Sequence, residues 1–348
     1  MSPLIYTTLL SSLGLGTTLT FMSSHWLLAW MGLEINTLAM VPLMIRQGHP
    51  RATEASTKYF LTQATAASVI LFAALCNAWV SAQWSIDQLI HPLTSTLMLL
   101  ALSLKIGLAP FHAWLPEVLQ GVDLTTGLIL STWQKLAPFC ILLQLQPPHP
   151  ELLIFIGTIS IMIGGWAGLN QTQLRKILAY SSIAHLGWMM IIIQFSSRLS
   201  LLALLIYITM TLSVFLTLSM TSTTTISKLT SAWTKSTTIA CLIPLVLLSL
   251  GGLPPLTGFI PKWLIINELT KQSLVMVAVI SALSALLSLF FYLRLTYAMT
   301  LTTSPDNTPS FAAWQAPKPH STALLPPATI ASMALIPIAP TVSALIFI

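Results

Sequence analysis

The chain has 348 residues, of which 55% are hydrophobic and only 6% are charged, and its formal net charge is +6 at pH 7. A soluble domain of this size needs a polar surface, which so few polar side chains cannot supply, so the composition excludes a soluble globular protein. The basic residues are scattered singly and do not form a cluster, which favours a role in membrane orientation over nucleic-acid binding.

The hydrophobic pattern predicts an all-α, polytopic membrane bundle, with about eleven transmembrane helices at about 20 apolar residues per span. The predicted spans cover 3–22, 25–45, 57–80, 93–120, 124–145, 151–169, 174–195, 199–222, 237–271, 274–299 and 324–347. The proline-rich stretch 300–322 is predicted to be the one extramembrane linker. The chain is therefore predicted to be a single transmembrane domain.

The second predicted span contains a carboxylate, Glu34, near its middle. A charge at the middle of a transmembrane helix costs roughly 2.5–3.5 kcal/mol on insertion scales, and it is by default a functional-site hypothesis. Because desolvation disfavours the charged form, Glu34 is expected either to be protonated or to lie close to a cation.

The fourth and ninth predicted spans are interrupted by glycine and proline at matching positions. Proline removes a hydrogen bond of the helix and clashes with the preceding turn. Three of these positions recur at the same offset of 145 residues: Gly107 and Gly252, Pro110 and Pro255, Pro116 and Pro261. The alternative is that glycine and proline are simply common in transmembrane helices.

The two interrupted spans predict an internal repeat. An odd number of span-to-span steps separates them, so the second copy (151–300) is expected to be inverted relative to the first (1–145). Interrupted helices at corresponding positions of two inverted halves indicate a transport site near the membrane midplane.

The loop charges predict the orientation. Basic residues concentrate after even-numbered spans: Arg46, Arg51, Lys58, Arg175, Lys176, Lys228, Lys235, Arg294 and Lys318. Only Arg198 and Lys271 follow odd-numbered spans. The even side, with the N-terminus, is therefore expected to face the matrix or cytoplasm.

Three lysines fall in or beside apolar spans: Lys105 before the Pro110 break, Lys135 within the fifth span and Lys262 after Pro261. A buried lysine gains or loses its proton readily, and unpaired helix carbonyls at the break are expected to share the Lys105 proton. One glutamate cannot neutralise three lysines, which favours mobile protons. The alternatives are a static ion pair between Glu34 and Lys105 and a Lys262 side chain that extends to the lipid headgroups.

Two histidines are possible proton relays near neutral pH. His112 follows Pro110 in the broken span and could face a hydrated cavity, and His185 lies in the middle of the seventh span. Either could instead be a hydrogen-bonded packing residue. Lys105, Lys135, His185 and Lys262 are expected to line up near mid-membrane, with water or hydroxyl groups between them.

Motifs that would bind a cofactor or metal are not found. The cysteines, Cys76, Cys140 and Cys241, lack CxxC spacing and are expected to be buried small hydrophobic residues. The sequence contains no complete GxGxxG, no P-loop and no histidine pair at haem spacing. We therefore expect no cofactor-binding and no metal site in this chain.

Three segments resemble one known family. SLKIGLAPFHAWLPE, from Ser103 to Glu117, is similar to the broken helix of proton-translocating NADH dehydrogenase subunits related to cation/proton antiporters. WMGLEIN (30–36) and GGLPPLTGFIPKW (251–263) resemble the glutamate helix and the second broken helix of that family, and the resemblance runs nearly end to end.

The resemblance implies roles for single residues. Glu34 would be the pairing carboxylate, Lys105 its partner, Lys135 the central-axis lysine and Lys262 the exit-side lysine. It implies a proton-translocating core membrane subunit of NADH:ubiquinone oxidoreductase, without a redox centre of its own.

The same resemblance implies an assembly. NADH, FMN, Fe–S clusters and ubiquinone would be bound by other subunits of respiratory complex I. The partners would be other membrane-arm subunits, including neighbouring antiporter-like ones, and phospholipids, in the mitochondrial inner membrane with the N-terminus on the matrix side. One alternative is a free-standing secondary cation/proton antiporter. Another is a structural scaffold, whose buried lysines would tolerate replacement by Met or Leu.

Overall fold

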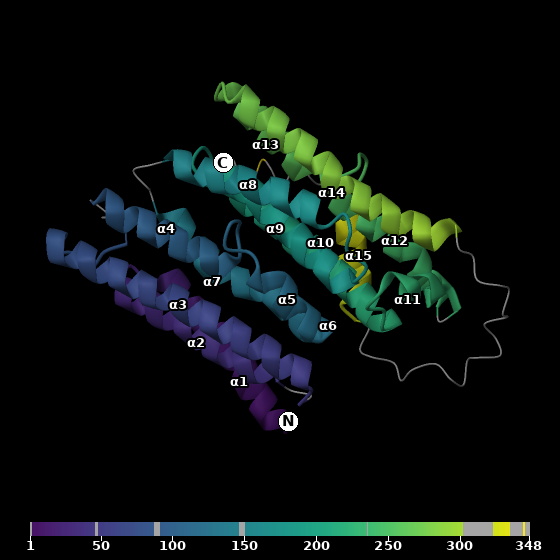
Figure 1. Cartoon of the computed structure of the whole chain (residues 1–348), viewed down its shortest axis with the longest axis horizontal. Coiled ribbons are helices and arrows are strands. Elements are labelled where there is room, and N and C mark those ends of the chain that lie inside the picture. Colours follow the sequence, from purple (N-terminus) through teal and green to yellow (C-terminus); the bar gives the residue numbers. More distant parts are fainter. Residues whose placement is uncertain are drawn as a thin grey trace. The chain divides into compact units, whose positions relative to one another are not determined.

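The structure is a computed structural model that describes residues 2–45, 48–86, 91–145, 150–234, 236–301, 323–334 and 344. All regular elements of this described part are helices, as predicted from the sequence. The chain divides into two compact units, Met1–Gly157 and Thr158–Ile348 (Figure 1). The boundary lies inside helix α8 (Pro150–Ala167).

The first unit is built around a long helix, α3. Its elements are α1 (Pro3–Met22), α2 (Trp26–Met44), α3 (Pro50–Ser81), α4 (Pro92–Ile106), α5 (Trp114–Gly121), α6 (Leu124–Ser131) and α7 (Trp133–Gln144). Helix α3 packs against α2, α4 and α5, while α7 contacts α1, α2 and α4. These contacts bring α2, α3, α4 and α7 together around one interior.

The second unit is built around α10. Its elements after α8 are α9 (Leu174–Ile192), α10 (Ser197–Thr221), α11 (Ile226–Thr230), a 3-10 turn (Ser231–Thr234), α12 (Thr237–Gly251), α13 (Phe259–Lys271), α14 (Val275–Leu301) and α15 (Leu325–Ala334). Helix α10 contacts α9, α12, α13 and α15, and α14 packs on α9, α12 and α13.

Seven helices in the described part of the chain are long and apolar enough to cross a membrane: α1, α2, α3, α6 with α7, α8, α10 and α14. The other predicted spans correspond to α9, to the broken pairs α4–α5 and α12–α13, and to α15. Most of the predicted linker 300–322, and the end of the last predicted span, lie outside the described residues. The pattern is that of a multi-pass membrane protein.

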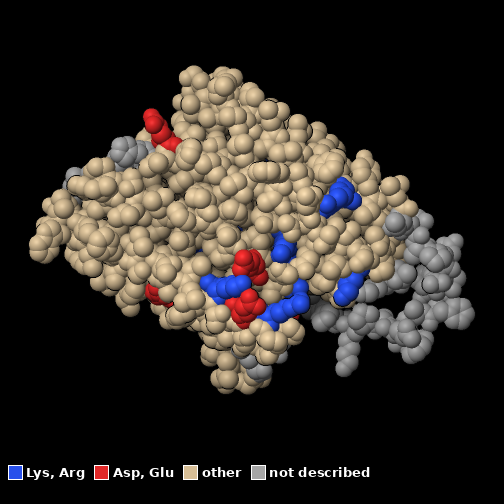
Figure 2. All heavy atoms as spheres, in the orientation of Figure 1, with Lys and Arg blue, Asp and Glu red and all other residues tan. Residues whose placement is uncertain are grey.

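Charged side chains occupy only small areas of the face in Figure 2, most of which is uncharged. An exposed cluster joins α3 to α5: Lys58 Nζ lies 2.8 Å from a carboxylate oxygen of Glu54 and 2.8 Å from one of Glu117. The predicted start of the third span, at 57, is wrong: α3 begins at Pro50. The helix begins before its apolar part because His49 caps its N-terminus and because proline, here Pro50, is favoured in the first turn of a helix.

The predicted fifth span is interrupted. A single non-helical residue, Thr132, separates α6 from α7, so Lys135 is the third residue of a helix rather than a mid-helix residue. The Thr132 hydroxyl donates to the Leu128 carbonyl at 2.7 Å, in competition with the backbone ladder. Threonine is common in membrane helices, so its type alone does not reveal the interruption.

The expectation that all three cysteines are buried is wrong. Cys241 is exposed, and Cys76 and Cys140 are only partly buried. Apolar side chains of a membrane protein can face lipid, so hydrophobicity does not imply burial inside the protein in this class.

Two glycines allow α1 and α2 to approach closely. A Cβ built on Gly32 would lie 2.8 Å from the Gly16 carbonyl oxygen, and a Cβ on Gly16 would overlap the Asn36 side chain. Small residues at helix crossings permit this approach in membrane proteins. The contact holds α2, and with it Asn36, in place.

We expect Gly16→Val to destabilise the assembled protein by about 1–3 kcal/mol, the cost of overpacking a tight interior. Gly14→Val is the matched control, because no atom lies within 4 Å of a Cβ at Gly14. The thermal unfolding temperature of the purified protein measures the difference. Equal unfolding temperatures for the two variants would contradict the close packing.

Candidate functional site

Both predicted breaks are confirmed, and they have the same local form. Helix α4 ends at Gly107, whose φ is +84°, and α12 ends at Gly252, whose φ is +78°. Left-handed backbone at a helix end favours glycine because it has no Cβ. The chain then runs without regular helix to α5 in the first unit and to α13 in the second. The two breaks therefore share both their offset and their backbone conformation.

The carbonyl groups beside the first break are already paired. The Ser103 carbonyl accepts from the Gly107 and Leu108 amides, both at 2.9 Å. The Leu104 carbonyl accepts from the Trp114 indole at 3.1 Å. The Lys105 carbonyl accepts from the Gln63 amide at 3.3 Å. These three carbonyls are therefore not unpaired, Lys105 Nζ makes no hydrogen bond to them, and the expected sharing of its proton with carbonyls at the break stays a prediction.

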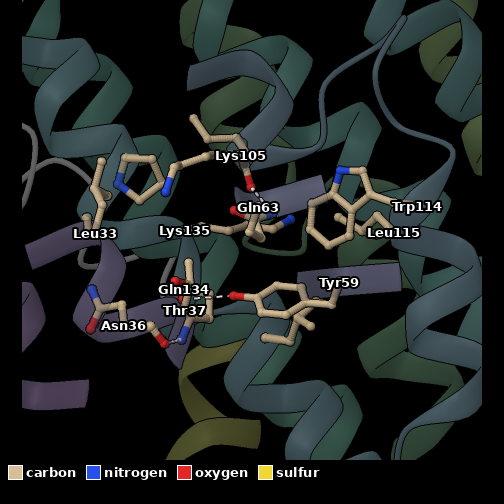
Figure 3. Close-up of a pocket in the computed structure, with 14 residues that line it drawn as sticks. Leu33, Asn36, Thr37, Tyr59, Gln63, Lys105, Trp114, Leu115, Gln134 and Lys135 are labelled. Atoms are coloured by element: carbon tan, nitrogen blue, oxygen red, sulfur yellow. Dashed lines mark hydrogen bonds between the residues drawn. The ribbon is translucent and has the colours of Figure 1, made fainter. Parts of the chain in front are cut away.

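A small cavity of about 20 Å³ lies next to this break in the first unit. Lys105 and Lys135 both line it, and their side chains are 6% and 3% exposed. Figure 3 shows the lining side chains coming together from α2, α3, α4 and α7. The structure thus brings two of the predicted lysines to one enclosed space.

The other polar residues that line this cavity were not predicted as site residues. Tyr59 donates to the Gln134 side-chain oxygen at 3.5 Å, and the Gln134 amide donates to the Asn36 carbonyl at 3.2 Å (Figure 3). Gln63 lies one turn after Tyr59 on α3. A signal was present in the sequence, since Tyr59 and Gln63 are four residues apart and so lie on one face of the predicted helix.

Several polar atoms of the cavity residues are buried without a hydrogen-bond partner: Lys105 Nζ and both side-chain amide atoms, Nδ2 and Oδ1, of Asn36. A buried polar group without a partner costs about 1–3 kcal/mol, and more when it is charged. Such groups in a protein interior need an explanation, and a catalytic role or a bound water are two that recur in native structures.

Glu34 connects to the cavity through its neighbour on α2. The Thr37 hydroxyl donates to Glu34 Oε2 at 2.9 Å, and Thr37 lines the cavity. Among the described residues Glu34 makes no ion pair within 4 Å, so the direct pair with Lys105 is not formed. Its carboxylate still acts electrostatically on Lys105 and on Tyr59.

Lys262 folds back toward the second break. Its ammonium donates to the Gly251 carbonyl at 2.7 Å, at the C-terminal end of α12. The end of a helix carries partial negative charge, which favours a cation there. This contact places the Lys262 ammonium group at the helix break inside the second unit. The side chain therefore does not extend toward the lipid headgroups.

His185 and Lys262 line a second small cavity, of about 10 Å³, with Ser181, Ser288 and Tyr292. The imidazole is 8% exposed, and its centroid lies 5.6 Å from that of the Tyr207 ring. The cavity is lined by α9, α13 and α14. The structure therefore brings His185 together with Lys262, and the proposed line from Lys105 and Lys135 through both units stays a prediction.

His112 does not line either of these cavities. Its Nδ1 lies 3.3 Å from the Pro110 carbonyl oxygen, beside the first break. Within the described ranges, no group of three or more His, Cys, Asp or Glu side chains is placed to hold a metal ion.

Replacing His185 by leucine is expected to slow proton transfer by up to about tenfold, less than loss of a lysine, because Lys262 remains in the same cavity. Assembly is expected to be unchanged, since leucine fills a similar volume. Proton uptake per NADH oxidised, in vesicles holding the assembled enzyme, is the measurement. An unchanged ratio would identify His185 as a packing residue.

Comparison with known proteins identifies relatives of both parts of the chain. The family model described as NADH:quinone oxidoreductase/Mrp antiporter, TM, matches residues 23–288. A model of the NADH dehydrogenase subunit 2 C-terminus matches residues 289–343. NADH-ubiquinone oxidoreductase chain 2 of Tetraodon nigroviridis is 61% identical, with 98% of each chain covered. The same chain of Salmo salar is also 61% identical, with 99% of each covered.

Solved structures share the fold. A chain of respiratory complex I from Thermus thermophilus, solved with bound aureothin, has a TM-score of 0.86 and 28% identity; the match covers 99% of this chain and 80% of that one. A chain of the Mrp complex from Dietzia sp. has a TM-score of 0.74 at 17% identity, covering 85% of this chain and 60% of that one. The second likeness concerns the fold alone.

Proposed function

Because the chain belongs to the NADH-ubiquinone oxidoreductase chain 2 family of antiporter-like membrane subunits, we propose that it translocates protons as a membrane subunit of NADH:ubiquinone oxidoreductase. The electron-transfer chemistry then takes place in other subunits, which bind NADH, FMN, Fe–S clusters and ubiquinone. This chain supplies protonatable groups and the cavities in which they lie.

The observation that carries the proposal is the pair of lysines in one cavity beside a helix break. Lys105 and Lys135 are almost fully buried, and Lys105 Nζ has no hydrogen-bond partner. Burying an ammonium group is costly unless it is paired. A role in taking up and releasing a proton would explain why a lysine is buried at each of these positions. For packing alone, an apolar side chain would be less costly to bury.

The groups of the proposed path lie near one another within each unit. Glu34 acts on Lys105 and is held by Thr37. Lys135 shares the Lys105 cavity, and Lys262 shares its cavity with His185. A change of charge at one group alters the free energy of protonation of the next, which is the basis of charge-coupled proton transfer. His112, beside the first break, is a further possible relay.

The partners follow from the same proposal. They are the other membrane-arm subunits, including neighbouring antiporter-like ones, together with phospholipids. The chain resides in the mitochondrial inner membrane with its N-terminus on the matrix side, which places the basic loops of the even side on the more negative face. The whole assembly acts as a translocase.

A matched pair of variants on one helix tests the function. Lys262→Met is expected to lower proton transfer through this chain by about two orders of magnitude, because it removes the one lysine that lines this cavity. Lys271→Met is the control: Lys271 is also on α13, but its side chain is 63% exposed and pairs only with Glu268. Proton uptake per NADH oxidised, in vesicles holding the assembled enzyme, is measured.

Two results would oppose the proposal. Equal proton uptake by the two variants would favour a scaffold role for the buried lysine. Cation/proton exchange by the isolated chain in vesicles, without NADH and the other subunits, would instead favour a free-standing antiporter.

A further inference from the structure

We infer that helix α15 positions Lys262, through a hydrogen bond from the Thr257 hydroxyl to the Ser332 backbone carbonyl. The bond holds the non-helical segment between α12 and α13, and this segment leads directly into the first turn of α13, which carries Lys262. The inference rests on the proposed function of Lys262, and it assigns a role to the C-terminal part of the chain.

The bond is short and enclosed. The Thr257 hydroxyl lies 2.5 Å from the Ser332 carbonyl oxygen, and both residues are completely buried. Helix α15 also packs against α10 and α12, beside the same break (Figure 1). The hydroxyl therefore joins two segments that are 75 residues apart in the sequence.

Thr257 is also tied to the start of α13 through its backbone. Its carbonyl accepts from the Ile260 amide at 3.2 Å, in the first turn of the helix that carries Lys262. Thr257 is thus bonded to α15 through its side-chain hydroxyl and to α13 through its backbone carbonyl. A shift of this residue is transmitted to Lys262, which lies one turn further on.

The geometry around the Lys262 ammonium leaves little room for such a shift. A Cβ built on Gly252 would lie 2.9 Å from Lys262 Nζ, and a Cβ on Gly258 would overlap the Ser249 carbonyl. The segment 252–258 is closely packed at both ends. The contact with α15 is a further restraint on this segment. Loss of that contact would therefore increase the mobility of the whole segment 252–258.

The bond also joins the two parts of the chain that distinct family models match. Thr257 lies in the antiporter-like part, residues 23–288, and Ser332 in the subunit 2 C-terminus, residues 289–343. The C-terminal part therefore supports a helix break that belongs to the shared antiporter-like core.

Three variants of the assembled enzyme test the role of the hydroxyl. Thr257→Val removes the donor at nearly constant volume, and Thr257→Ser keeps it. Ser332→Ala is the matched control, because the acceptor is a backbone carbonyl that this change leaves in place. Two quantities are measured: hydrogen–deuterium exchange of the amides from 252 to 260, and proton uptake per NADH oxidised in vesicles.

We expect Thr257→Val to raise the exchange rate about fivefold, the factor that corresponds to one buried hydrogen bond. Proton uptake per NADH is expected to fall, while NADH oxidation with a protonophore stays unchanged. Thr257→Ser and Ser332→Ala should match the unmodified protein in both measurements.

Unchanged exchange in Thr257→Val would overturn the inference, because the bond would then not hold the segment. Faster exchange with unchanged proton uptake would also overturn it, because the bond would then stabilise the fold without positioning Lys262. The failure of the proposed function is a separate result, seen as unchanged proton uptake in Lys262→Met.

Discussion

Glu34→Gln and Lys105→Met are each expected to lower proton transfer through this chain by about two orders of magnitude, the usual range for loss of an acid–base group. The double variant is expected to lose little more than either single one. Lys105 has no hydrogen-bond partner at Nζ, and the Glu34 carboxylate acts on it through space. We therefore expect the two groups to be coupled, so that removing one removes the coupling.

The measurement is a double-mutant cycle on proton uptake per NADH oxidised, with NADH oxidation followed separately. Glu54→Gln is the matched control for the glutamate, because Glu54 is an exposed partner of Lys58 on α3. Exposed ion pairs of this kind contribute about 0–1 kcal/mol, so the control should change neither quantity. Simple additivity of the two single effects would show that Glu34 and Lys105 act independently.

Lys135→Met is expected to have an effect of similar size, about two orders of magnitude on proton transfer, with the assembled enzyme intact. Lys135 is 3% exposed and lies in the same cavity as Lys105. Methionine has a similar length and is apolar, so packing is kept and the protonatable group alone is lost. Loss of this group interrupts the path between the first cavity and the rest of the chain.

Lys271→Met again provides the lysine control, since its side chain is largely exposed. The assembled amount of each variant is compared by native gel, and proton uptake is measured in vesicles at equal enzyme content. Normal proton uptake in Lys135→Met would mean that the buried lysine serves packing. Loss of assembly in both lysine variants would show that the measured defect is not specific to proton transfer.

The sequence by itself determined the class of the protein, the course of its spans and the position of both breaks. Hydrophobicity is a property of single residues and can be read directly from the sequence. A long run of hydrophobic residues predicts a helix in lipid, because every backbone N–H and C=O group there must be hydrogen-bonded within the segment. Gly107 and Gly252 could be recognised as helix ends because glycine adopts their left-handed backbone conformation without the strain that a Cβ would cause.

The partners of the buried charges were decided only by the tertiary structure. Asn36 is on α2, Tyr59 and Gln63 are on α3 and Lys105 is on α4. Only the packing of these helices with α7 brings the side chains to one cavity. The direction of the Lys262 side chain was likewise decided by the tertiary structure. A residue after Pro261 can reach either the headgroups or the end of α12, and the fold selects the Gly251 carbonyl. Contacts between helices depend on rotation and depth, which local sequence does not specify.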